Sequence, residues 1–447
     1  MRKTGSKIRL ACQLHFDEGA DPRNGAGEPQ RLREVNEMNS AQTRGRFGVA
    51  ALVLAVAVLP AMADFETAMS HLKSGNYLEA AGEFQALVDE SPDYADGYHL
   101  LGVCFLKSGK YEDAEKNFLK AIELNGDKFD YHYNLANAYR IQNKHDKVVK
   151  TLNNAEGLAA ANQKYLVYQI RGHALCAEQK WAEAIDDLEK AVAAKPDTAT
   201  QAQLGKAYFF VGENASAVTA LRKAVQMGAG EGSNMLLVEA MINVAAKTGG
   251  GEAAKRAKYG EALREAEKFL NTNPGSLDAR YLVGRTALGA GQFDMAIGAF
   301  QEVLKKEANH CNAMTNLGKS YQARGDWPNA LKALDQATTC DPKLGLAWET
   351  KGFVLQKMAS GSKDFATQQR NYEKAIASYE KAQAIKPKSS TATAIQTCQQ
   401  NLQISRENQA SARSEEEQER LIEEEEARIA AEEAKRAEWE AKRNNDD

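Results

Sequence analysis

Histidine and cysteine are the residues of this sequence best suited to metal binding or nucleophilic chemistry, and both are sparse. The 447 residues contain seven histidines and six cysteines. No two histidines stand in a His-x-x-x-His spacing, which would place two imidazoles on one face of a helix, and no Cys-x-x-Cys pair occurs. The sequence therefore predicts neither a metal site nor a bound cofactor.

Catalytic motifs with a fixed geometry are also missing from the sequence. It has no glycine-rich phosphate loop, no Gly-x-Ser-x-Gly nucleophile elbow and no dinucleotide-binding fingerprint. An active site would have to be assembled from side chains scattered along the chain, because repeats occupy nearly all of its length. We therefore expect a protein that is not an enzyme.

The elements that must position any functional side chain are repeated. One pattern returns between Asp64 and Pro387, most clearly as "LLGVCFLKSGKYEDAEKNFLKAIELNGD" and "NLGKSYQARGDWPNALKALDQATTCDPK". A small residue is followed nine positions later by an aromatic residue or a substitute, and an alanine or near equivalent comes three positions after that. The small residues are Ala68, Gly102, Ala136, Gly172, Gly205, Gly284, Gly318 and Gly352, and several of the steps between them are 34 residues.

Each repeat contains two runs of apolar residues at helical spacing. In one unit Leu101 and Phe105 precede a Ser-Gly-Lys turn, and Ala114, Phe118 and Ile122 follow it. The pattern predicts two helices joined by that turn. One such pair cannot bury its own apolar face, so successive pairs must stack on each other.

This pattern resembles the tetratricopeptide repeat (TPR) family. The resemblance extends over about nine units in residues 64–390, and it implies an all-α solenoid of helix pairs, a right-handed superhelix with a concave and a convex surface. Two insertions, "AAKTGGGEAAKRAK" and "ASGSKDFATQQR", fall between the paired helices of their units. We expect both to protrude at one edge, either beside a binding surface or as tolerated surface loops.

In the resembled family the first helix of each unit forms the concave wall, which identifies ten candidate partner-binding residues. Amide side chains there can pair with the backbone of an extended peptide, and Lys and Arg can bind its carboxylates. The alternative is that these are ordinary solvated helix positions. The sequence lacks the full set of Lys and Asn placements of the family's terminal-carboxylate clamp, so that ligand is not implied. The candidates are Tyr133, Asn134, Asn137, Arg140, Lys206, Phe209, Tyr281, Arg285, Asn316 and Lys319.

Two cysteines are placed where a disulfide could form. Cys311 opens the first helix of a unit and Cys340 closes its second helix, and antiparallel helices bring those two ends together. In an oxidising compartment we expect a disulfide, and the alternative is two unpaired thiols. Cys104 and Cys176 lie among apolar residues and are expected to be buried free thiols.

Charge is concentrated at the two ends of the sequence. Residues 1–63 hold nine Lys and Arg against six Asp and Glu, a net charge of +3. Since the whole sequence has a net charge of −4, the rest of the chain has a net charge of −7. From Ser414 onward there are fourteen acidic and six basic residues, a net of −8, so the repeats are close to neutral. Without a basic face, nucleic-acid binding is not expected. The expected partner is a protein or a peptide.

The C-terminal region has a composition of its own. Residues 391–412 are predicted to form one amphipathic capping helix over the last repeat. Residues 413–447 are predicted to be a solvated acidic tail, helical or disordered, with acids and bases three or four positions apart. Its apolar residues keep no sustained heptad, so a coiled coil is not favoured.

The N-terminal region has the layout of a secretory signal peptide in residues 38–63. Arg44 and Arg46 precede an apolar run from Phe47 to Leu59, and a small-x-small triplet ends at Ala63. The run is too short to favour a transmembrane helix, so the mature chain should begin at Asp64 without an integral membrane span. Residues 1–37 are then a mis-called start or a disordered extension. The alternative is a membrane anchor formed by residues 47–63.

Taken together, these features predict a non-catalytic protein–protein interaction scaffold outside the cytoplasm, periplasmic or secreted. It would hold a peptide segment or a partner protein in its concave groove, with the acidic tail available for a second contact. The alternatives are a structural assembly factor of a cell-envelope complex and an accessory subunit of a cell-wall or polysaccharide enzyme. The sequence specifies neither the partner nor the oligomeric state.

Overall fold

The computed structural model describes residues 65–443, and every regular element in that range is an α-helix. The predicted all-α helix-pair fold is thereby confirmed. The predicted extension (residues 1–37) and signal peptide (residues 38–63) lie outside the described residues. The chain divides into two compact units, one ending at Gln203 and the other beginning at Leu204. The division falls within α11 (Thr198–Val211).

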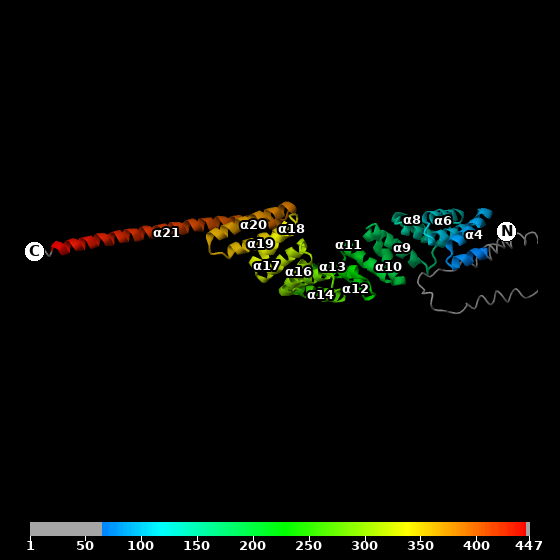
Figure 1. Ribbon diagram of the computed structural model, residues 1–447, viewed down its shortest axis with the longest axis horizontal. Helices are drawn as coiled ribbons and strands as arrows, with labels where there is room; N and C mark the ends of the chain where they lie inside the picture. Colours follow the sequence, from blue (N-terminus) through cyan, green and yellow to red (C-terminus); the bar gives the residue numbers. More distant parts are fainter. Residues whose placement is uncertain (1–64, 444–447) are drawn as a thin grey trace, which may run out of the picture. The chain divides into compact units, whose positions relative to one another are not determined.

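Unit 1 consists of antiparallel helix pairs in chain order (Figure 1). A helix over residues 65–73 pairs with the first labelled helix, and each later pair packs on the one before it. The labelled helices are α4 (Tyr77–Glu90), α5 (Ala95–Lys107), α6 (Tyr111–Leu124), α7 (Phe129–Ile141), α8 (His145–Ala155), α9 (Lys164–Ala177) and α10 (Trp181–Ala194).

Unit 2 continues the same arrangement and adds one long final helix. Its helices are α12 (Asn214–Gln226), α13 (Glu231–Lys247), α14 (Gly251–Thr272), α15 (Leu277–Ala290), α16 (Phe293–Lys306), α17 (Cys311–Arg324), α18 (Trp327–Cys340), α19 (Gly345–Ser360), α20 (Phe365–Ile385) and α21 (Ser389–Arg443). The two insertions form extra helical turns, because α14 has 22 residues and α20 has 21 where α16 and α18 have 14.

The small residue of each unit sits where the two helices of a pair come closest. A Cβ atom added to Gly284 would lie 2.6 Å from the ring of Phe300 on the second helix, and one added to Gly318 would lie 2.6 Å from Leu334. Real Cβ atoms are not found that close to a carbon atom, so a larger residue would push the pair apart. The small residues therefore allow the paired helices to approach closely at these two contacts.

The turn between paired helices needs a residue in the left-handed backbone region. In regular units this residue is a glycine seven positions after the small residue, such as Gly109 (φ 79°) and Gly291 (φ 83°). Asn143 (φ 56°) and Gln179 (φ 60°) take the same position in the repeats that begin with α7 and α9. Glycine has no Cβ and enters this region without steric cost, whereas a side chain such as that of Gln179 adds strain.

Large apolar side chains of the second helices pack against the first helix of their own pair and against the next pair. Phe84, Phe118 and Phe300 have 0% exposure, and Phe269 has 1%. Burial of one such side chain contributes about 2–3 kcal/mol relative to its exposure to water. Packing within and between pairs therefore stabilises each unit, as expected for repeats.

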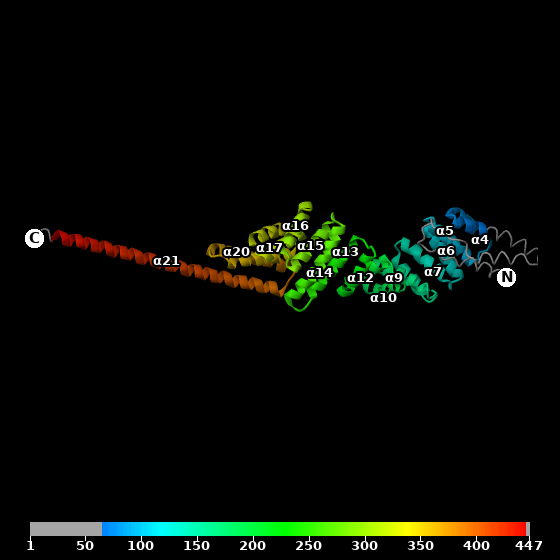
Figure 2. The ribbon, with the colours of Figure 1, turned by 90° about the horizontal axis from the view of Figure 1, so that it is seen from below.

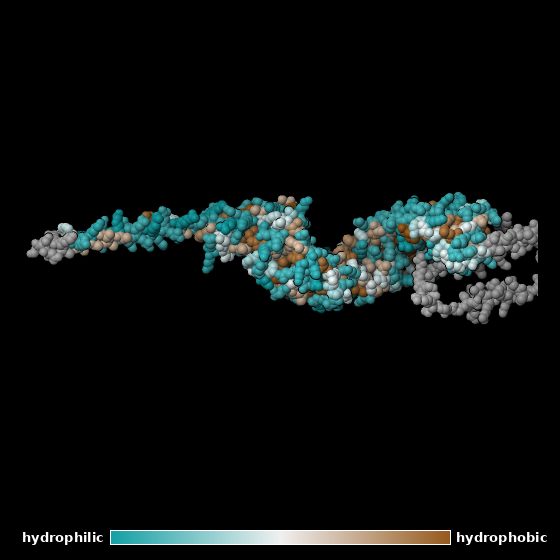
Figure 3. Space-filling model, in the orientation of Figure 1, coloured by the Kyte–Doolittle hydropathy of each residue, from teal (hydrophilic) through white to brown (hydrophobic). Residues whose placement is uncertain are grey.

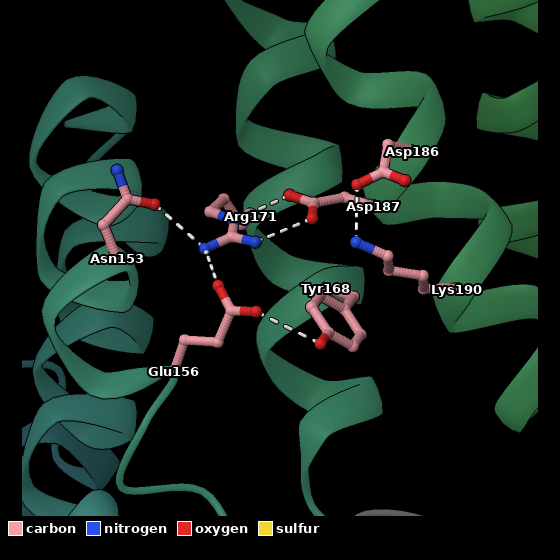
Figure 4. A network of polar contacts seen from close by, with 7 residues as sticks. All are labelled: Asn153, Glu156, Tyr168, Arg171, Asp186, Asp187 and Lys190. Carbon is pink, nitrogen blue, oxygen red and sulfur yellow. Dashed lines mark hydrogen bonds and ion pairs between the residues drawn. The ribbon is translucent and has the colours of Figure 1, made fainter.

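A polar network in unit 1 adds a directional contact between three elements (Figure 4). Arg171 on α9 donates two hydrogen bonds to the carboxylate of Asp187 on α10, at 2.7 and 2.8 Å. Its third nitrogen donates to Asn153 on α8 at 2.9 Å and to Glu156 just beyond α8 at 2.8 Å. Asp187 is 4% exposed, so the guanidinium neutralises a buried charge at the junction of two repeats.

The final helix, α21, has a packed part and a projecting part (Figures 1 and 2). Cys398 and Leu402 are buried against Tyr372 and Tyr379 of α20. From residue 413 onward the helix is exposed as far as its side chains are described, and this part is mostly hydrophilic (Figure 3). The helix shows no break between the two predicted segments, because residues 389–443 contain neither glycine nor proline.

The length and apolarity of the helices also bear on membrane insertion. Within residues 65–443, no helix combines the length and the apolar composition that would be needed to cross a membrane.

Candidate partner-binding surface

The ten predicted surface residues divide into two groups, one in each unit. Four of them lie on α7 in unit 1, namely Tyr133, Asn134, Asn137 and Arg140. The other six lie in unit 2 on α11, α15 and α17, namely Lys206, Phe209, Tyr281, Arg285, Asn316 and Lys319. Each group belongs to the first helices of its repeats.

The group in unit 1 is largely engaged with neighbouring side chains. The amide nitrogen of Asn134 lies 2.8 Å from Nε2 of His99 on α5, and Arg140 donates to Asn137 at 3.3 Å. The ring of Tyr133 lies 5.7 Å from that of Phe129. Only Arg140 is fully exposed among the four predicted residues. This surface therefore offers one cation and several amide groups that already have partners.

His99 was not among the predicted residues, although it faces Asn134. Burial lowers its pKa to about 4, against a smaller opposing effect from Asp96. The imidazole is therefore neutral at pH 7 and accepts the Asn134 hydrogen bond through Nε2. Its position three residues before Gly102 is the position of Tyr133 before Ala136, a periodicity that would have identified it.

Part of the group in unit 2 makes contacts between first helices, from α13 to α15 and from α15 to α17. Asn316 on α17 donates a hydrogen bond of 2.9 Å to the hydroxyl oxygen of Tyr281 on α15. Arg285 on α15 forms an ion pair with Glu239 on α13. Phe209 on α11 lies edge-to-face with Phe210, their ring centres 5.5 Å apart. The repeat therefore brings the predicted polar residues of α15 and α17 together.

Lys319 differs from Arg285 in having no ion-pair partner. Its side chain is partly covered, and within residues 65–443 it makes no hydrogen bond and no ion pair closer than 4.0 Å. Burial and the nearby positive charge of Arg285 lower its pKa, while Glu349 raises it. The ammonium group is thus destabilised in the unbound protein, because the attraction of Glu349 offsets its desolvation only in part.

Two acidic residues that sequence reasoning missed complete this surface. Glu349 on α19 is paired with Lys388, and Glu239 is paired with Arg285. Both carboxylates are therefore neutralised, and the charge of Lys319 is left over. We name Glu239, Tyr281, Arg285, Asn316, Lys319 and Glu349 the unit 2 strip.

Only one of the two missed residues carries a signal in the sequence. Glu349 stands three residues before Gly352, as Tyr281 stands before Gly284. Glu239 belongs to the unit with the insertion, which has no small residue in phase. Its pairing with Arg285 could not be inferred from the repeat.

The cysteines of the described range form one disulfide and three buried sites. Cys311 and Cys340 are joined by a disulfide with their Cα atoms 5.6 Å apart. Cys104, Cys176 and Cys398 are buried and are not part of a disulfide. No cluster of three or more His, Cys, Asp or Glu side chains suited to a metal ion occurs in the part of the chain that the structure describes.

Comparison with known structures finds other repeat proteins. The chain is similar to the C-terminal part of a TPR repeat-containing protein from Cytophaga hutchinsonii, with 16% identity, a TM-score of 0.43 and coverage of 59% of this chain and 99% of that one. A tetratricopeptide repeat protein from Parabacteroides merdae shares 13% identity, with a TM-score of 0.42 and coverage of 62% and 98%. PilF of Pseudomonas aeruginosa shares 17% identity, with a TM-score of 0.38 and coverage of 49% and 95%.

Comparison of the sequence gives the family. A search of the curated proteins finds no match. Profiles described as tetratricopeptide repeat match residues 38–95, 95–128, 249–310, 313–344 and 364–389. Helix pairs, small contact residues and left-handed turns recur in the described part of these segments, which identifies the matched segments as tetratricopeptide repeats.

Proposed function

We propose that this protein is a non-catalytic scaffold that binds an extended, acidic segment of a partner protein along the unit 2 strip. Tetratricopeptide repeats indicate a protein–protein interaction scaffold, and such repeats are generally not catalytic. The observation that carries the more specific proposal is the partly covered, unpaired ammonium group of Lys319 beside Arg285.

A carboxylate is the ligand that best satisfies this site. The two acidic residues of the strip already have cationic partners, so the remaining field at Lys319 is positive. A carboxylate placed there would form a charge-assisted hydrogen bond and return the pKa of Lys319 toward its ordinary value. The hydroxyl of Tyr281 and the amide of Asn316 lie next to it and can contact the backbone of the bound segment.

We also propose that the protein works outside the cytoplasm, in the periplasm or after secretion, with cleavage near Ala63. The signal-peptide pattern in residues 38–63 supports this, and so does the disulfide between Cys311 and Cys340, since such bonds persist in oxidising compartments. The alternative is anchoring by residues 47–63. N-terminal sequencing of the exported protein distinguishes the two, because an uncleaved chain would retain that segment.

Binding of a labelled hexaglutamate peptide tests the proposed site. Lys319→Glu should weaken binding by about tenfold or more, because a repulsion replaces an attraction in a partly desolvated site. Lys332→Glu is the matched control, since it makes the same charge change at an exposed position of α18. Hexaglutamine should bind weakly to all three proteins. Equal loss of binding in both variants would reduce the effect to net charge and contradict the site.

A further inference from the structure

We propose that the disulfide between Cys311 and Cys340 is a redox control of partner binding, such that its reduction weakens binding of acidic segments to the unit 2 strip. This inference rests on the function proposed for the strip. It assigns a regulatory role to a bond that lies outside the binding surface but on the same repeat.

The disulfide closes the repeat that carries Lys319. Cys311 is the first residue of α17 and Cys340 is the last residue of α18, so the bond ties the start of one helix to the end of its partner. Asn316 and Lys319 lie one and two turns further along α17. The bond therefore fixes the end of the helix that presents both of these side chains.

A short series of contacts connects the bond to the strip. His310 precedes Cys311, and its ring lies 4.9 Å from that of Tyr281. His310 Nδ1 also accepts a hydrogen bond of 3.1 Å from the backbone N–H of Ala313, which holds the ring at the start of α17. Tyr281 in turn accepts the hydrogen bond from Asn316. Movement at Cys311 would thus displace His310, which packs against the aromatic ring of the strip.

The disulfide is open to a reductant. It borders a surface hollow lined by residues of the α16–α17 connection and the end of α18, namely Glu307, Ala308, Asn309, His310, Cys311, Asn312 and Asp341. The remaining cysteines of the described range are buried, and burial raises the pKa of Cys104 to about 12 and that of Cys398 to about 11. Cys104 and Cys398 therefore keep their protons at neutral pH, which disfavours thiol–disulfide exchange at these two residues.

Reduction requires a dithiol, which supplies two electrons. Its thiolate attacks the sulfur of Cys340, a mixed disulfide forms there, and Cys311 leaves as a thiolate at the N-terminal end of α17, where backbone N–H groups stabilise negative charge. The second thiolate of the dithiol then attacks the other dithiol sulfur, which is bonded to Cys340 in the mixed disulfide, and Cys340 leaves as a thiolate. The products are two protein thiols and the oxidised, cyclic dithiol.

The coupling has a reciprocal consequence. If the oxidised protein binds an acidic segment more tightly by some factor, the bound segment must shift the dithiol–disulfide equilibrium toward the oxidised protein by the same factor. The two effects can be measured independently of each other, which makes the inference quantitative.

The first experiment compares hexaglutamate binding by the full chain before and after treatment with dithiothreitol. Reduction should weaken binding by about fivefold to twentyfold, within the range typical for coupled sites. Cys311→Ser combined with Cys340→Ser should bind like the reduced protein and should not respond to dithiothreitol. His310→Ala keeps the disulfide but removes the ring beside Tyr281, and it should weaken binding to a similar degree. Circular dichroism at the binding temperature confirms that each protein remains helical.

The outcomes separate the two proposals. Equal binding by the oxidised and reduced proteins, with binding still sensitive to Lys319→Glu, would overturn the redox control and leave the proposed function standing. Absence of hexaglutamate binding by the oxidised protein would overturn both. Hydrogen exchange locates the effect, because reduction should accelerate amide exchange in residues 307–319, and unchanged exchange there would contradict the route through His310.

Discussion

Arg171 donates two parallel hydrogen bonds to Asp187, from Nε at 2.7 Å and from Nη2 at 2.8 Å. The carboxylate is 4% exposed, so it depends on this guanidinium for its stability. Asp187→Asn keeps the shape of the side chain but removes its charge and one acceptor. We expect it to lower the free energy of unfolding of unit 1 by about 2–3 kcal/mol.

Asp186→Asn provides the control for that prediction. Asp186 is adjacent in sequence, but its side chain is 72% exposed and it pairs only with Lys190 on the same helix. Exposed pairs of this kind contribute less than about 1 kcal/mol. Urea unfolding monitored by circular dichroism should show a larger loss of unfolding free energy for Asp187→Asn than for Asp186→Asn. Similar losses in the two variants would contradict a stabilising role for the bidentate contact.

Glycines of one helix pair should respond in opposite directions to alanine. Gly284→Ala places a methyl group 2.6 Å from the ring of Phe300, and we expect it to destabilise unit 2 by about 1–3 kcal/mol. Gly298 lies within α16 with no atom inside 4 Å of its added Cβ, so Gly298→Ala should stabilise by about 0.5–1 kcal/mol. Thermal melts of the two variants check the signs, and a stabilised Gly284→Ala would refute the close-contact role of the small residue.

Acid should destabilise unit 1 through His99. Its folded pKa is about 4, below its ordinary value of 6.5, so the unfolded chain takes up the proton first as the pH falls. The contribution of the neutral imidazole is complete above pH 6.5 and is lost between pH 6.5 and 4. From pH 7 to 5.5 the loss should be about 1 kcal/mol.

His99→Gln tests the source of that pH dependence. Glutamine can still bond to Asn134 but does not titrate, so the variant should lose less stability than the natural protein over the same interval. Urea midpoints at pH 7 and 5.5 give the comparison. His173, whose pKa burial also lowers, remains in both proteins and accounts for part of any residual slope.

Two leucines of α21 should differ sharply on truncation. Leu402 is 8% exposed in the packed part, and Leu402→Ala should cost about 2–4 kcal/mol in the stability of unit 2. Leu421 is 55% exposed in the projecting part, and Leu421→Ala should change stability by less than about 0.5 kcal/mol. Chemical denaturation monitored by tyrosine fluorescence compares them. A large loss for Leu421→Ala would mean that the projecting part packs on something.

The regular features of the fold could be predicted because each follows from one residue type at one repeated position. Gly284 and Gly318 occupy the same phase of the repeat in the sequence, and in the structure both lie at the contact between paired helices. The insertions were placed between paired helices, but their conversion into extra turns of α14 and α20 depends on packing that the repeat does not encode.

The charges of the unit 2 strip could be predicted only in part. Arg285 and Lys319 were found because they follow the small residue of their units. The pairing of Arg285 with Glu239 could not be predicted, since it joins two successive repeats of unit 2, and the repeat of Glu239 departs from the pattern. Whether a cationic side chain has an ion-pair partner depends on such contacts between repeats. The presence or absence of that partner decides whether the side chain is available to bind a ligand. The sequence therefore indicated which helix face to examine but not which residue stands without a partner.

The absence of any glycine or proline in α21 has a mechanical consequence. At 1.5 Å per residue, the stretch after residue 412 is a strut of about 45 Å. A molecule bound near its end would be held at a fixed distance from the last repeat. Shortening this part of the helix would therefore change that distance without changing the affinity of the repeats for their partner.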